Sequence, residues 1–75
     1  MLFTKLKAKR ELDAIIFEID VNLANNYKDV AHDNRRLLGR RVEGLYASGS
    51  LKEKDYLFYR AKYETYTQVM KDYHH

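Results

Sequence analysis

Six residues near the C-terminus recur at alternating steps of three and four, and five of them are tyrosines. This spacing places all six on one stripe of a single helix. A tyrosine stripe buries large apolar rings while each hydroxyl needs a polar partner at the edge of the packed region. We therefore expect a helix over about residues 51–73 whose core-facing stripe consists of Tyr56, Tyr59, Tyr63, Tyr66, Met70 and Tyr73. A stacking platform for bases or an aromatic cage for a cation is the functional alternative.

The residues before this stripe predict a turn. Gly49 is suited to the left-handed position that ends a helix. Ser50 followed three residues later by Glu53 has the capping-box pattern that opens one. The pattern indicates a helical hairpin with its turn at residues 48–50. The partner helix would lie upstream, and we expect Gly39 or Gly44 to let a ring of Tyr59 or Tyr63 approach its backbone.

Upstream, from about residue 5 to 47, apolar residues also follow helical spacing. Their phase continues across Asn25 and Asn26, through Leu12, Ile16, Ile19, Leu23, Val30 and Leu37. The continuity favours one uninterrupted long first helix, which would complete a helical bundle by self-association. The alternative is a break at Asn25-Asn26, because asparagine readily occupies caps and left-handed positions, and this would give a monomeric three-helix bundle.

A second apolar side favours association. Phe17 and Val21 lie on the side of the first helix opposite its main apolar stripe. A helix with apolar residues on two sides tends to have both sides covered by other helices. We expect a homo-oligomer, a dimer or a tetramer. The residues predicted to form its core or interface are Ile16, Ile19, Leu23, Val30, Leu37, Tyr56, Tyr59, Tyr63, Tyr66 and Met70.

Composition limits the remaining choices. A chain of 75 residues forms one domain, residues 1–75, and the absence of proline and cysteine is typical of an all-α protein without disulfides. The N-terminal residues do not have the pattern of a signal peptide, and no apolar run is long enough to span a bilayer. We expect a cytoplasmic protein that does not associate with membranes. The composition resembles that of many small bacterial or phage proteins.

The basic residues give a second functional hypothesis. Arg35, Arg36, Arg40 and Arg41 are clustered, and lysines crowd the N-terminus, so phosphate contact through Arg35, Arg36 and Arg40 would make a nucleic-acid-binding accessory protein. However, the arginines spread around the helix, acidic residues lie between them, and the net charge is only +3. Solvated ion pairs are the favoured interpretation.

No catalytic motif, cofactor site or metal site is predicted. The chain has no phosphate-binding loop and no arrangement of nucleophile and base. Asp29, His32 and Asp33 do not make up the ligand set of a bundle-type metal site, which needs carboxylates from at least two helices. The sequence thus predicts a non-enzymatic interaction or scaffold protein that acts through association of helices.

Overall fold

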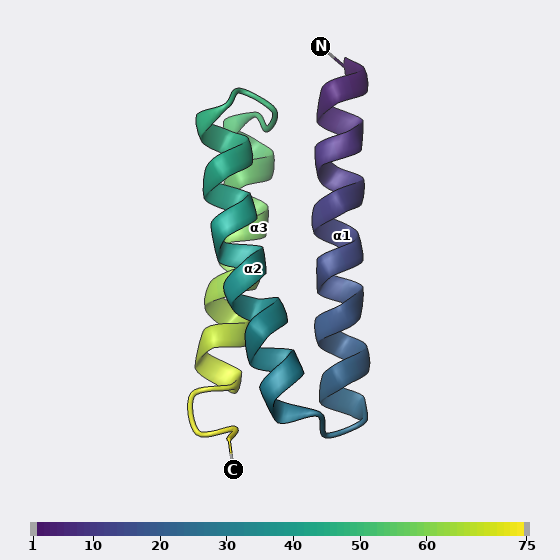
Figure 1. The fold of residues 1–75 in the computed structure, drawn as a ribbon. Coiled ribbons are helices and arrows are strands. Elements are labelled where there is room, and N and C mark those ends of the chain that lie inside the picture. The colour runs from purple at the N-terminus through teal and green to yellow at the C-terminus, as the bar shows by residue number, and fades with distance from the viewer. Residues whose placement is uncertain (1, 75) are drawn as a thin grey trace.

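The computed structural model describes residues 2–74, and within that range the chain is all-helical, with three helices and no strand. They are α1 (Leu2–Ala24), α2 (Lys28–Ala47) and α3 (Glu53–Val69). Helices α1 and α3 run in the same direction, and α2 runs the opposite way and packs against both (Figure 1). The resulting body measures 42 × 17 × 14 Å. The prediction of an all-α fold is confirmed.

The predicted uninterrupted first helix is wrong, because the chain reverses direction at residues 25–27. Asn26 adopts a left-handed conformation with φ 60°. Its N–H donates to the carbonyl of Leu23 at 3.1 Å, and the N–H of Tyr27 donates to the carbonyl of Asn22 at 2.8 Å. These two bonds make a Schellman motif, which satisfies the last carbonyls of α1 and turns the chain sharply. Asparagine tolerates this conformation better than most residues, so no glycine is needed.

The second junction uses the same motif. Gly49 has φ +81°, its N–H donates to the carbonyl of Tyr46, and the N–H of Ser50 donates to the carbonyl of Leu45. The expected helix-terminating role of Gly49 is confirmed. The capping box is wrong, since α3 begins only at Glu53, after Lys52, with no side-chain cap. The intervening Leu51 is buried in the core, which holds these residues out of the helix.

The core lies between the three helices. Its fully buried large side chains come from α1, from α2 and from the turn after α3: Leu12, Ile19, Leu38, Val42 and Met70. Val30, one of the residues predicted for the core or the interface, lies outside this core and is 48% exposed. The break before α2 explains this, because it rotates the buried stripe of α2 onto Ala31 and Leu38. Asn22 is the buried polar residue among those described, and its amide donates to Asn34 Oδ1 at 2.7 Å.

Candidate helix-docking surface

The tyrosine stripe faces the core of the chain and uses its hydroxyls to bind the neighbouring helices. Tyr59 is only 4% exposed, Met70 is fully buried, and Tyr56, Tyr63, Tyr66 and Tyr73 pack partly buried against the same core. The stripe is thus covered by the chain's own helices, which removes the open ring faces that a base platform requires.

The hydroxyl contacts form a regular ladder between the parallel helices α1 and α3. Tyr59 Oη donates to Asp13 Oδ1 at 2.7 Å, and Tyr66 Oη donates to Asp20 Oδ1. Donor and acceptor each advance by seven residues, so successive rungs lie two helical turns apart. Beyond α3, Tyr73 Oη donates to the side chain of Asn26 at 2.8 Å. This ladder fixes the register of α1 against α3.

Two acceptors of this ladder were missed by sequence reasoning. Asn26 accepts the hydrogen bond of Tyr73, whereas Asn34 accepts from Asn22 and Arg41 binds Glu11. The missed acceptors are Asp13 and Asp20. Their spacing of seven residues matches that of Tyr59 and Tyr66, and this shared spacing was the available signal.

Burial and these carboxylates change the acidity of the phenols. The pKa of Tyr59 and that of Tyr66 are each raised well above the ordinary range, first by desolvation and then by the hydrogen bond to the carboxylate. The pKa of Tyr56 is raised by its hydrogen bond to Glu43. All three phenols are therefore harder to deprotonate than a free tyrosine, and each donates its proton in a hydrogen bond to the carboxylate.

Close packing explains one glycine. A Cβ built on Gly39 would lie 2.6 Å from Cε1 of the Tyr63 ring, whereas a Cβ built on Gly44 would lie 3.9 Å from Arg41 Nη1. Real Cβ atoms do not approach as closely as 2.6 Å. The expectation that a glycine of the second helical segment admits a tyrosine ring is confirmed for Gly39 and Tyr63.

The predicted phosphate-binding arginines are only partly brought together. Arg36 and Arg40 line a shallow groove of about 620 Å³ between α2 and α3, which they share with Arg60. Arg35 is not part of it. Its position on α2 is three residues before Leu38, on the buried side, and its Nε is buried without a hydrogen bond.

Acidic side chains balance the charge of this groove. Arg36 binds Asp33 at 2.6 Å, and Arg60 binds Glu64 at 2.9 Å and lies 3.6 Å from Glu43. Two of its three guanidinium groups, those of Arg36 and Arg60, have carboxylate partners and gain less from phosphate than free basic side chains would. Arg40 forms no ion pair with residues 2–74.

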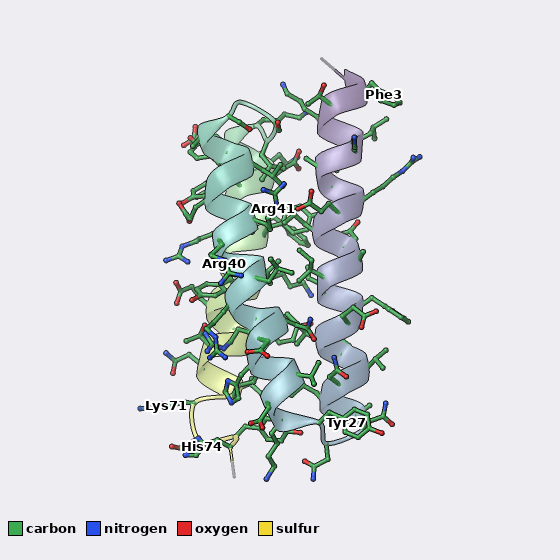
Figure 2. The ribbon with its side chains drawn as sticks, in the orientation of Figure 1. Phe3, Tyr27, Arg40, Arg41, Lys71 and His74 are labelled. Atoms are coloured by element: carbon green, nitrogen blue, oxygen red, sulfur yellow. The ribbon has the colours of Figure 1, made fainter. Side chains whose placement is uncertain are left out.

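The opposite side of the molecule carries a different surface, which we call the outer face of α1. Positions at alternating steps of four and three along α1 share this face, turned away from the core. Phe3 is 74% exposed and Phe17 is 64% exposed, and Figure 2 shows Phe3 on the side of α1 away from α2. The outer face consists of Phe3, Lys7, Arg10, Ala14, Phe17, Val21 and Ala24.

A groove of about 510 Å³ between α1 and α2 borders the outer face, and we call it the α1–α2 groove. Its apolar lining comes from Ala14, Ile15 and Phe17 of α1 and from Leu37 of α2. Arg41 of α2, which also lines this groove, donates two hydrogen bonds to the carboxylate of Glu11 on α1. Figure 2 shows the Arg41 side chain between the two helices. The arginine lowers the pKa of Glu11.

The charges of α1 are completely segregated along its length. The basic residues are Lys5, Lys7, Lys9 and Arg10, and every acidic residue, Glu11, Asp13, Glu18 and Asp20, follows them. This order opposes the helix dipole, which favours acidic residues in the first turn and basic residues in the last. Some of these charges have partners on α2 or α3. Lys7, Arg10 and Glu18 form no ion pair or hydrogen bond with residues 2–74.

Two kinds of feature are absent from residues 2–74. No group of three or more His, Cys, Asp or Glu side chains is placed to hold a metal ion. None of the three helices has the length and apolar character needed to cross a membrane. In comparisons with known proteins, no family model, no curated protein and no solved structure matches this chain.

Proposed function

We propose that the chain is a small, non-enzymatic interaction protein of the cytoplasm that acts by docking helices against one another. In this proposal each copy keeps its three helices as a bundle, and copies associate into a dimer or tetramer through the outer face of α1 and the α1–α2 groove. A further protein partner would use the same surface.

One observation carries the proposal, namely the exposure of Phe3 and Phe17 on the face of α1 opposite the core. Scattered exposed hydrophobes are normal on any surface. Here, however, the two rings share one helical face with Ala14 and Val21, next to a groove with apolar walls. Lys7 and Arg10 separate Phe3 from the other apolar positions, but the cluster of Ala14, Phe17 and Val21 beside an apolar groove is of the kind that marks interaction sites.

The proposal is tested by measuring the solution mass with size-exclusion chromatography and light scattering, over a range of micromolar concentrations at moderate salt. A mass of two or four chains supports association. A mass of one chain at every concentration would overturn self-association, because nothing would then cover the outer face of α1 in solution.

The arginine-lined groove between α2 and α3 supports a second candidate, contact with nucleic-acid phosphates. The observation in its favour is that Arg40 is exposed and lines the groove beside Arg36. Binding of this kind weakens steeply as salt rises, whereas apolar helix association does not. Titration with labelled single- and double-stranded DNA at low and moderate salt separates the two, and Arg40→Ala should reduce binding if this groove is the contact.

A further inference from the structure

The segregation of charge along α1 also bears on the orientation of a partner helix. A second copy of α1 laid parallel to the first would place basic residues against basic residues and acidic against acidic. Laid antiparallel, the basic segment of each copy lies beside the acidic segment of the other. Like charges across an interface cost free energy and opposite charges favour the register that joins them.

The apolar positions of the outer face fit the same orientation. From Phe3 to Val21 its steps read four, three, four, three, four, which is the same in both directions. An antiparallel copy can therefore bring the face onto itself, with Phe3 opposite Val21 and Arg10 opposite Ala14 of the second copy. In this register Lys7 lies beside Phe17 and Glu18 of the second copy, and the two-fold axis repeats each contact.

We propose, building on the function proposed above, that two copies of this chain pair through an antiparallel α1–α1 interface. The outer face of α1 supplies its apolar seam, and the basic N-terminal and acidic C-terminal segments of α1 set its orientation. The second copy would supply opposite charges to Lys7, Arg10 and Glu18, which are exposed and form no ion pair or hydrogen bond with residues 2–74. Within its own chain Lys7 has only a coulombic interaction with Glu11. The charge order of α1, which opposes its own dipole, gains a role in this pairing.

Charge reversal tests the orientation. We expect Lys7→Glu and Glu18→Lys each to raise the dimer dissociation constant by about tenfold, because two symmetric contacts become repulsive. The double variant K7E/E18K should return it to near the starting value. Lys62→Glu on α3 is the matched control, since it changes net charge as Lys7→Glu does but lies away from the outer face of α1, and it should leave dissociation unchanged. Sedimentation velocity gives the constants, and circular dichroism verifies that each variant is folded.

A second measurement uses the absence of cysteine from the chain. Variants Arg10→Cys and Ala14→Cys, mixed under oxidising conditions, should form mainly the mixed disulfide, because only the antiparallel register brings these positions within bonding distance. Disulfides between identical variants would show parallel pairing. A dimer that ignores the charge reversals, or that cross-links in this parallel manner, would overturn the antiparallel interface while leaving the proposed function intact. A chain that is monomeric at every concentration would overturn both.

Discussion

At the scale of single residues, tyrosine hydroxyls connect the helices and tie folding to pH. Tyr59 and Tyr66 donate to aspartates of α1, and burial together with these carboxylates raises the pKa of both phenols. In the unfolded chain tyrosine loses its proton near pH ~10. Above that pH the folded state binds more protons than the unfolded state, so stability is fully present below pH ~10 and falls as pH rises further.

We therefore predict that Y59F/Y66F lessens the loss of stability at high pH. Each such tyrosine contributes a slope of up to ~1.4 kcal/mol per pH unit above pH ~10. The variant should lose up to ~2 kcal/mol at neutral pH from its two missing hydrogen bonds. Urea unfolding between neutral pH and pH ~11 measures both effects. Tyr27→Phe is the control, because this exposed hydroxyl makes no hydrogen bond with residues 2–74. Parallel curves for the parent and the double variant would contradict the argument.

Replacing each of the two glycines of α2 by alanine should change the stability of the chain in opposite directions. Gly44→Ala should stabilise the chain by up to ~1 kcal/mol, because alanine is the better helix former and its Cβ makes only an ordinary contact, 3.9 Å from Arg41 Nη1. Gly39→Ala gains the same propensity but forces the Tyr63 ring to move, and overpacking costs ~1–3 kcal/mol. We expect a net loss. Thermal unfolding compares the two variants, and a G39A protein as stable as G44A would show that the ring yields freely.

At the scale of helices, sequence reasoning found the apolar faces but not every boundary. The spacing of the tyrosine stripe and the glycine at position 49 identified α3 and the end of α2. The same method favoured continuity at Asn25-Asn26, because Leu23, Val30 and Leu37 repeat every seven residues. That repeat persists whether the chain continues or reverses in a short turn. The break is made by the backbone hydrogen bonds of a Schellman motif. Any residue that can adopt a positive φ can form this motif, so the spacing of apolar residues does not reveal it.

Substitution of Asn26 tests this junction. Asn26→Ala should cost about 1–2 kcal/mol, because a Cβ without a local polar side chain is disfavoured at φ 60° and the hydrogen bond from Tyr73 is lost. Asn26→Gly should cost less, since glycine adopts this conformation freely. A continuous helix would give the reverse order, with alanine stabilising and glycine destabilising. Urea midpoints of the two variants distinguish these outcomes, and Asn25→Ala serves as a neighbouring control.

At the scale of the whole molecule, three helices leave α1 with more apolar surface than α2 and α3 cover. Its inner stripe, including Leu12 and Ile19, is fully buried. Its outer face nevertheless carries Phe17, and the α1–α2 groove beside it has apolar walls. The sequence indicated this second face through Phe17 and Val21. The sequence does not identify the helix that would pack on this face, because the residues of a partner are not encoded in the spacing of residues along α1.

Folding and association should therefore be separable at Phe17. We predict that Phe17→Glu remains folded, with monomer stability changed by no more than ~0.5 kcal/mol, because this side chain lies outside the core. In the parent chain, association that requires the folded state makes the melting temperature rise with protein concentration. The variant should lose that dependence while keeping its helical circular dichroism. Leu57→Glu, at a similarly exposed position on α3, should retain it. If the Phe17→Glu variant is unfolded, Phe17 is needed for the stability of the single chain. If its melting temperature still rises with protein concentration, the interface lies elsewhere.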